Sequence, residues 1–292
     1  MNLISIAHKF PTQESCIEHL EAVRWPENAS CPHCGSDRVR RKKENDRVGR
    51  WNCHDCTNSF NVLQGTIFQG TQIPLQKWFL AVALMVNAKK SLSSCQLARD
   101  LGMNQGSCWS MMRRIREAMA SEERHFLRGI VEADECYIGG KPRKRNKRDD
   151  DGDPPKRGRG TKKTAVIGAV ERGGKVVARV AHDLSGKGIM KFIKNAVDTA
   201  ETVLVTDELN AYKPLDSIMA RLSVNHQERY VDGDVHTNTV EGFWSHLKRA
   251  WYGQHHHYSK PYTPLYVAEA CWKYNRRERD DGFEGFIKGV FA

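Results

Sequence analysis

Two pairs of cysteines have the spacing of a metal site. Cys31 and Cys34 form one Cys-x-x-Cys pair, and Cys53 and Cys56 form a second pair after eighteen intervening residues. Each pair can present two thiolates from one tight turn, and two such turns complete a tetrahedron around one ion. Four thiolates fill the coordination shell of zinc. We therefore predict one structural Zn2+ with no open position for a substrate.

The segments between the cysteine pairs are expected to form a zinc ribbon. Residues 38–41 and 50–52 have the composition of short strands, and Gly35 permits the turn after the first pair. Four unrelated reduced cysteines are the alternative, which the spacing of both pairs argues against. A ribbon of this size is not expected to fold without its metal.

Three acidic residues fall where a second kind of metal site can form. Asp134 lies at the centre of an apolar strand candidate at 130–138, Asp207 ends another strand, and Glu241 lies on a later helix. Carboxylate oxygens are ligands of hard divalent cations such as Mg2+. Two such ions about 4 Å apart can activate an attacking oxygen and stabilise a leaving one in phosphoryl transfer. These residue types therefore predict metal-dependent chemistry on a phosphodiester.

The elements that carry these acids follow a defined order. A strand at 130–138 is followed by a hairpin at 164–181, an amphipathic helix at 189–200, an apolar strand at 202–207 and a helix at 238–249. An RNase H-like fold places its first and fourth strands side by side and packs a helix over their ends. This order therefore predicts a mixed β-sheet flanked by helices, with the three acids brought together.

Asn238 competes with Glu241 for the third position beside the two aspartates. Asn238 stands where a helix N-cap belongs, and Glu241 three residues later completes the pattern of a capping box. A capping glutamate would bond to the backbone and leave the metals to other groups. We favour Glu241 as ligand and Asn238 as cap, because two divalent ions need negative charge that an amide does not supply. Lys248, two turns further along the same face, is a catalytic candidate that can contact phosphate beside the metals.

Three further residues lie close to the acids in the sequence. Glu135 is predicted to be structural, because strand alternation points it away from Asp134. Glu132 shares the face of Asp134 and can support it. His236 either positions an attacking water or 3′-hydroxyl or is an ordinary loop histidine.

Three helices are predicted between the cysteine-rich segment and the first acid, at 75–86, 95–101 and 105–120. Ser93 or Ser94 can cap the second helix and Gly102 can end it. A short helix, a tight turn with glycine and a polar, basic helix are typical of a helix-turn-helix that enters the major groove of DNA. The outward-facing side chains expected to contact DNA include Arg113, Arg114 and Arg116.

The composition fits a globular protein with a polyanionic partner. The chain has 292 residues, 28% of them charged, and a net charge of +11, which favours binding to phosphates. Residues 141–163 hold eleven Lys or Arg against four Asp, so we expect a flexible basic arm that contacts DNA. The DNA-binding candidates in this arm are Lys141, Arg143, Lys144 and Arg145, and Arg249 at the end of the helix at 238–249 is a further one. The longest apolar run, 78–86, is too short to span a bilayer and no secretory signal is visible, so a cytoplasmic, nucleoid-associated protein is expected.

The sequence resembles the zinc-ribbon DDE transposases of the bacterial insertion-sequence 1595 family, which carry an ISXO2-like transposase domain. The most specific motifs are Asp134-Glu-Cys-Tyr-Ile-Gly-Gly-Lys141, Thr206-Asp207-Glu-Leu-Asn-Ala-Tyr212 and the segment 236–249. The resemblance covers most of the chain and implies an enzyme that moves a mobile element to target DNA with Mg2+ as cofactor. It carries the metal-binding role onto Asp134 and Asp207. The third position stays open, since some members are described with Asn in place of Glu.

We therefore expect a multidomain α+β protein in three parts. Residues 1–70 would hold an N-terminal helix and the zinc ribbon, 71–126 the helix-turn-helix, and 127–292 an RNase H-like domain with a flexible basic insertion at 139–163. The expected function is transposition: binding of element ends on double-stranded DNA, then strand cleavage and strand transfer with two Mg2+ or Mn2+ ions. We expect a homodimer or higher oligomer on DNA, with no membrane partner and no small-molecule substrate.

Two other classes of function fit parts of the pattern. One is a non-catalytic DNA-binding regulator with a degenerate nuclease domain, and the other is a structure-selective nuclease. The intact acids argue against the regulator, because buried unpaired carboxylates are costly without a metal or another partner. The nuclease would share the metal site but need no front end that recognises element ends.

Overall fold

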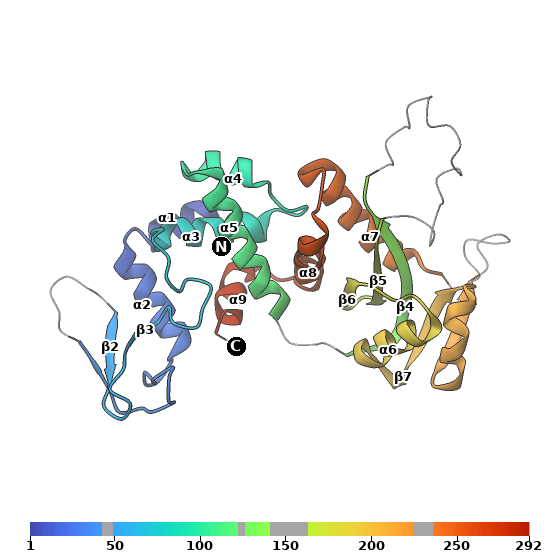
Figure 1. Cartoon of the computed structure of the whole chain (residues 1–292), viewed down its shortest axis with the longest axis horizontal. Helices are drawn as coiled ribbons and strands as arrows, with labels where there is room; N and C mark the ends of the chain where they lie inside the picture. Colours follow the sequence, from blue (N-terminus) through green and yellow to red (C-terminus); the bar gives the residue numbers. More distant parts are fainter. Residues whose placement is uncertain (43–48, 122–125, 141–162, 225–235, 292) are drawn as a thin grey trace. The chain divides into compact units, whose positions relative to one another are not determined.

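The computed structural model describes residues 1–42, 49–121, 126–140, 163–224 and 236–291 (Figure 1). The chain forms two compact units. Unit 1 comprises Met1–Glu122 together with Glu278–Ala292, and unit 2 comprises Glu123–Arg277. The chain therefore passes between the units twice. The end of the expected third part, which was to run to residue 292, belongs to unit 1 instead.

The first part of unit 1 is a pair of helices followed by a small sheet. Helices α1 (Leu3–Lys9) and α2 (Gln13–Arg24) precede three antiparallel strands, β1 (Val39–Arg41), β2 (Arg50–Cys53) and β3 (Ser59–Asn61). A capping box between Thr12 and Ser15 starts α2. The Glu21 carboxylate of α2 accepts hydrogen bonds from the Trp51 indole over 2.8 Å and from the Arg41 guanidinium. Glu21 therefore ties α2 to the ribbon.

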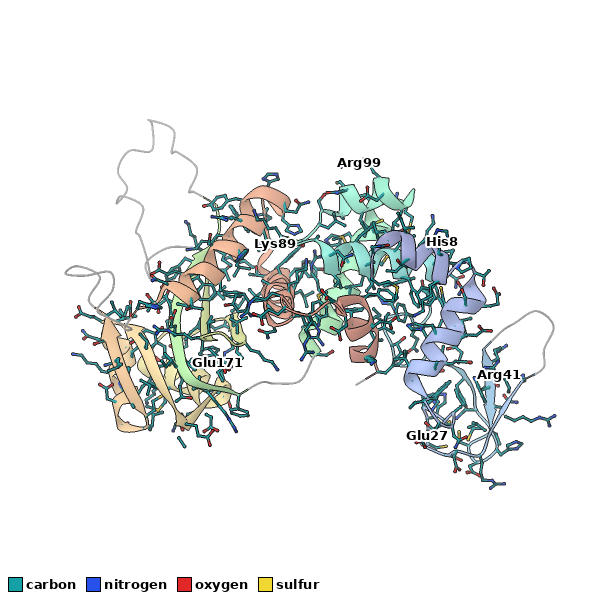
Figure 2. All side chains as sticks on the ribbon, turned by 180° about the vertical axis from the view of Figure 1, so that it is seen from behind. His8, Glu27, Arg41, Lys89, Arg99 and Glu171 are labelled. Carbon is teal, nitrogen blue, oxygen red and sulfur yellow. The ribbon has the colours of Figure 1, made fainter. Side chains whose placement is uncertain are left out.

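The second part of unit 1 contains the three expected helices, α3 (Leu75–Asn87), α4 (Ser94–Leu101) and α5 (Gln105–Ser121). The Ser93 side chain caps α4, and Gly102 ends it in the left-handed conformation with φ of 58°. Figure 2 shows the side chains of the described residues, including the exposed Arg99 on α4. Helix α9 (Gly282–Gly289) packs against α2, α3 and α5 (Figure 1).

Unit 2 is built on a five-stranded mixed sheet. Its strands are β4 (Leu127–Ile138), β5 (Thr164–Glu171), β6 (Val176–Val180), β7 (Val197–Asp207) and β8 (Ala220–Val224), in the order β6-β5-β4-β7-β8. The first three strands are antiparallel neighbours, whereas β7 and β8 run parallel to β4. This is the strand order of an RNase H-like domain, which confirms the predicted fold class.

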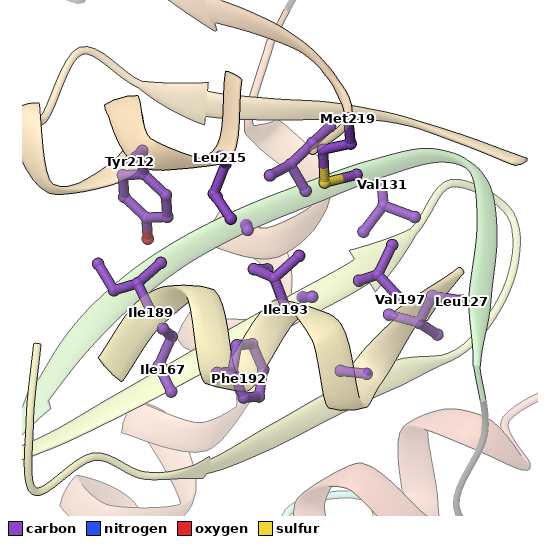
Figure 3. Packing of buried hydrophobic residues seen from close by; sticks show 14 residues of the cluster. Leu127, Val131, Ile167, Ile189, Phe192, Ile193, Val197, Tyr212, Leu215 and Met219 are labelled. Atoms are coloured by element: carbon purple, nitrogen blue, oxygen red, sulfur yellow. The ribbon is translucent and has the colours of Figure 1, made fainter. Parts of the chain in front are cut away.

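Helices cover both faces of the sheet in unit 2. Helix α6 (Gly186–Ala196) and the 3-10 helix η3 (Asn210–Ser217) pack on one face, where Phe192 and Ile193 meet Val131 (Figure 3). On the other face lie α7 (Asn238–Ala250) and α8 (Thr263–Asn275), joined by a π-helical turn η4 (Trp251–His255) and a 3-10 turn η5 (Lys260–Tyr262). No described helix is long and apolar enough to cross a membrane.

Helix α6 is shorter than the sequence predicts. It ends at Ala196 instead of near residue 200, and β7 begins at once with Val197. The reason is tertiary, because Val197 pairs with Leu127 across the first and fourth strands. A β-branched residue favours this extended pairing over continuation of the helix.

Candidate functional site

The four cysteines of the ribbon come together as predicted. The sulfur atoms of Cys31 and Cys56 lie 3.7 Å apart, those of Cys34 and Cys53 lie 3.6 Å apart, and all four lie within 4.8 Å of one another. Zinc–sulfur bonds of 2.3 Å in a tetrahedron place the sulfurs about 3.8 Å apart. The donor set and its spacing therefore fit Zn2+. Within the described ranges, no other group of three or more His, Cys, Asp or Glu side chains is poised around one point.

The two predicted aspartates occupy neighbouring positions of the sheet in unit 2. Glu132 of β4 lies opposite Val205 of the parallel strand β7. Two residues further along each strand stand Asp134 and Asp207, and parallel neighbours are about 4.8 Å apart. Asp207 is the last residue of β7, where the Leu209 amide donates to its Oδ1 over 3.2 Å. The sheet thus brings the first two acids together.

Asp134 is half-buried and lies in a negatively charged environment. Burial raises its pKa from 3.8 to about 7, and the charges of Glu135 and Asp207 act in the same direction. Hydrogen bonds from the Glu135 amide and the Trp244 indole favour the ionised form but do not offset this. A cation bound between the two carboxylates would favour that form, so this part of the site suits a divalent metal.

Helix α7 follows β4 along the face that carries Asp134. The Val240 amide donates to Glu132 over 3.0 Å, and one turn later the Trp244 indole donates to Asp134 Oδ2 over 3.0 Å. Another turn on, Lys248 lies near Cys136; burial raises the pKa of Cys136 to about 12 and the Lys248 charge opposes this. Four residues of a helix span about 6 Å and two residues of a strand about 6.7 Å. Every fourth residue of α7 can therefore contact every second residue of β4.

The prediction that Asn238 is the N-cap of α7 is wrong, and so is the alternative of a capping box between Asn238 and Glu241. The N-cap position is Thr237, and Asn238 is the first helical residue, exposed to solvent. Glu241 accepts a hydrogen bond from the Thr237 hydroxyl over 3.2 Å. The physical reason is that Glu132 of β4 receives the free amides of Thr239 and Val240, so no side chain at the helix start is needed as a cap.

Glu241 is free of the capping role but does not join the aspartates in one group in the described structure. It is exposed and lies one turn before Trp244, whose indole contacts Asp134. Its role as third metal ligand, and that of Asn238 as the competing residue, therefore stay predictions.

The neighbouring residues have defined contacts. Glu135 accepts a hydrogen bond from the buried Tyr212 hydroxyl over 3.0 Å, which joins the motif around Asp134 to the motif around Asp207. The Nδ1 atom of His236 lies 3.2 Å from Glu132 and 3.1 Å from Arg172 Nη2. Glu135 is therefore structural, and His236 belongs to a polar network beneath the start of α7.

Two of the three arginines on α5 that were predicted to contact DNA are held by contacts within unit 1. Arg116 is 3% exposed and donates to Ser91 Oγ over 3.4 Å, so the expectation that it faces outward is wrong. Arg114 donates to the Gln69 carbonyl over 2.7 Å and stacks on Trp78, which holds α5 in unit 1. Arg113 is partly exposed and pairs with Glu117 over 3.7 Å. The physical reason is packing, because α3 and the segments on either side of it contact α5.

The remaining DNA candidates come from other parts of the sequence than α5. Arg249 is exposed on α7. Four fall outside the described residues: Lys141, Arg143, Lys144 and Arg145.

Two residues beside Asp134 were not predicted from the sequence. Gly168 pairs with Asp134 across β4 and β5, and the indole of Trp244, a buried residue of α7, donates a hydrogen bond to Asp134. Gly168 itself is one signal in the sequence, since a glycine inside an apolar strand often marks the close approach of another element. The partner of that approach becomes visible only in the folded sheet.

The sheet order, the paired acids and the helix beside them define an RNase H-like domain preceded by a zinc ribbon. Two family models match the chain, the ISXO2-like transposase domain over residues 126–275 and the transposase zinc-ribbon domain over residues 11–59. The chain belongs to this family of transposases.

The chain is similar to one relative in sequence and, weakly, to two solved structures. A Halobacterium salinarum protein, described as an uncharacterized protein in transposable element ISH50, is 32% identical over 267 residues, which cover 88% of this chain and 89% of that protein. A pre-cleavage Mos1 transpososome matches with a TM-score of 0.29 and 11% identity over 72% of this chain and 78% of that chain. The Mos1 strand transfer complex matches with a TM-score of 0.30 and 13% identity over 73% of this chain and 76% of that chain.

Proposed function

We propose that this protein binds the ends of its insertion sequence and catalyses metal-dependent strand cleavage and strand transfer. The observation that carries the proposal is the placement of Asp134 and Asp207 on neighbouring strands, with α7 alongside. Burial and the nearby negative charges raise the pKa of Asp134 to about 7, which a bound cation would reverse. Two neighbouring carboxylates repel each other, and a bound cation would remove this cost.

The candidate ligands of the divalent cations are Asp134, Asp207 and Glu241. When bound, a pair of Mg2+ or Mn2+ ions supplies activation of the attacking oxygen and stabilisation of the leaving oxygen. Lys248 and Arg249 stand exposed on the same helix, beyond Trp244, and would hold the DNA phosphates there. Trp244 would keep one oxygen of Asp134 occupied and leave the other for the cation.

Unit 1 is proposed to recognise the ends of the element. Helices α4 and α5 would form its helix-turn-helix, which the left-handed turn at Gly102 between them supports. The first turn of α5 exposes Gln105 and Ser107, while Arg116 is buried. Base contacts are therefore expected from the beginning of α5, with Arg113 contacting phosphate. The ribbon and the basic arm at 141–163 would add contacts that do not depend on sequence.

The test uses purified full-length protein, labelled duplexes taken from the DNA on either side of its gene, Mg2+ and a target plasmid. The proposal expects cleavage at the element ends and a labelled product joined to the plasmid, both abolished by Asp207→Asn. Specific end binding with no cleavage would instead indicate a non-catalytic regulator. Cleavage of unrelated duplexes without joining would indicate a structure-selective nuclease.

A further inference from the structure

Glu132 is the most deeply buried carboxylate beside the site, and the proposed chemistry does not use it. It lies on β4 two residues before Asp134 and is 0% exposed. An ionised carboxylate in such a position is costly unless hydrogen bonds and an opposite charge satisfy it. The hydrogen-bond partners of Glu132 therefore indicate its structural role.

The partners of Glu132 come from two places far apart in the sequence. Arg172, in the turn after β5, donates to Oε1 over 2.7 Å, and His236 Nδ1 lies 3.2 Å from the same atom. From α7, the Thr239 hydroxyl donates over 2.9 Å, and the amides of Thr239 and Val240 donate to Oε2 over 2.7 and 3.0 Å. Arg172 also donates to the His236 carbonyl over 2.9 Å. One carboxylate thus fastens the start of α7 to the sheet.

This contact replaces an ordinary helix cap. The first amides of an α-helix lack partners within the helix, and negative charge at that end is favoured by the helix dipole. Thr237 makes no capping hydrogen bond to the backbone of α7. The cap is supplied by β4 instead, so the helix cannot begin at another residue or slide along the strand without leaving Glu132 unsatisfied.

The second fixed point of α7 is the hydrogen bond between Trp244 and Asp134. The two fixed points lie four residues apart on the helix and two apart on the strand, distances that agree within about 1 Å. Together they set both the position and the rotation of α7 over β4. Glu241 lies between them, directly after Val240 and three residues before Trp244.

We infer that Glu132 is a positioning residue that sets the register of α7, so that the Trp244 indole meets Asp134. This inference rests on the proposed function, because Asp134 is one of its candidate metal ligands. Glu132 itself contacts neither substrate nor metal. Its substitution should therefore alter the surroundings of Trp244 before any DNA or divalent ion is added.

The experiment compares Glu132→Gln with Glu269→Gln in the full-length protein. Glu269 is an equally buried carboxylate, 2% exposed on α8 and paired with Lys273, so its loss controls for general destabilisation. The first measurement is the indole 1H–15N resonance of Trp244 without metal, assigned with Trp244→Phe. The second is Mg2+-dependent end cleavage on DNA that both variants bind. We expect the resonance to move and cleavage to fall ~10–100-fold for Glu132→Gln alone, the usual cost of losing a residue that orients a ligand.

Thr239→Val is the milder variant, because it removes one donor to Glu132 and keeps both amides. It should move the Trp244 resonance in the same direction by less, and it decides the question if Glu132→Gln does not fold. An unmoved resonance with wild-type cleavage in the folded variants would overturn the inference. Failure of the wild-type protein to cleave DNA would refute the proposed function instead, since the resonance is measured without DNA.

Discussion

Gly168 and Trp244 fit against each other across the sheet and helix of unit 2. A methyl group added to Gly168 would lie 2.6 Å from Cη2 of the Trp244 indole, closer than real contacts allow. Gly168 stands directly opposite Asp134 on the neighbouring strand, so the space that it leaves is filled by the indole that bonds to this aspartate. A strand residue without a side chain thus lets a helix reach a candidate metal ligand.

Replacing Trp244 with Phe should remove the hydrogen bond to Asp134 and keep most of the packing. We expect Mg2+-dependent cleavage to fall ~10–100-fold, with a weaker apparent affinity for Mg2+ and unchanged DNA binding. Trp272→Phe, a buried tryptophan of α8, controls for lost aromatic volume. Equal losses in the two variants would show that packing alone matters at Trp244.

Gly168→Ala should displace the indole and reproduce the loss seen for Trp244→Phe. Because both changes act through one contact, the double variant should lose less than the sum of the two single losses. Gly242→Ala is the control, since an added methyl meets nothing within 4 Å on helix α7. That variant should be stabilised by about 0.5–1 kcal/mol in denaturant unfolding. Additive losses for Gly168 and Trp244 would contradict the shared contact.

The raised pKa of Asp134 makes the stability of the metal-free protein depend on pH. The folded protein holds this proton up to about pH 7, whereas the unfolded chain releases it near 3.8, so the stabilising contribution is lost as the pH rises through this window. Relative to Asp134→Asn, the wild type should therefore lose free energy of unfolding between these values and change little above them. Denaturant unfolding across a pH series measures the difference. A constant difference would refute the shift.

Glu241→Gln tests the third metal position. We expect strand transfer to be abolished while folding and end binding persist, because the amide keeps the shape but not the charge of the ligand. Asn238→Ala should stay active and equally stable, since Asn238 is exposed and Glu132 supplies the helix cap. An active Glu241→Gln variant beside an inactive Asn238→Ala variant would assign the position to Asn238.

Removal of zinc should affect the ribbon and leave unit 2 folded. Cys53→Ser should lower the zinc content from one ion per chain to none and unfold β1–β3, because a ribbon this small depends on its metal. Hydrogen exchange should then be fast in the ribbon and unchanged in β4–β7. Cys95→Ser removes an exposed cysteine outside the group and should keep the zinc. Full zinc content in Cys53→Ser would remove this residue from the ligand set.

The sequence predicted those features that depend on local spacing. The zinc ligands follow from two short motifs, and the ends of α4 follow from Ser93 and Gly102, whose effects reach only one turn. Asp134 and Asp207 were placed correctly because strand order and alternation determine which residues share an edge and a face. These features need no knowledge of distant partners.

The features that the sequence did not predict depend on contacts between distant residues. The cap of α7 comes from Glu132, 107 residues before the Thr239 amide that it accepts. Val197 leaves the helix because Leu127 pairs with it, and Arg116 is buried because Ser91 and α3 lie beside it. Helical periodicity reports which residues lie on a face, but it does not tell which face another element covers.

Because of helix α9, the core of unit 1 is completed only after unit 2 has been translated. Its Phe283 packs edge-on against Phe79 and near Phe10, at 5.4 and 6.1 Å between ring centroids, and it is 2% exposed in the core of unit 1. A ribosome makes the whole of Glu123–Arg277 before it reaches these residues. The nascent chain therefore carries an unfinished aromatic core, although domains usually fold in the order in which they are translated. A product truncated within unit 2 would lack Phe283, so only a chain translated through α9 completes the unit proposed to recognise the ends of its element.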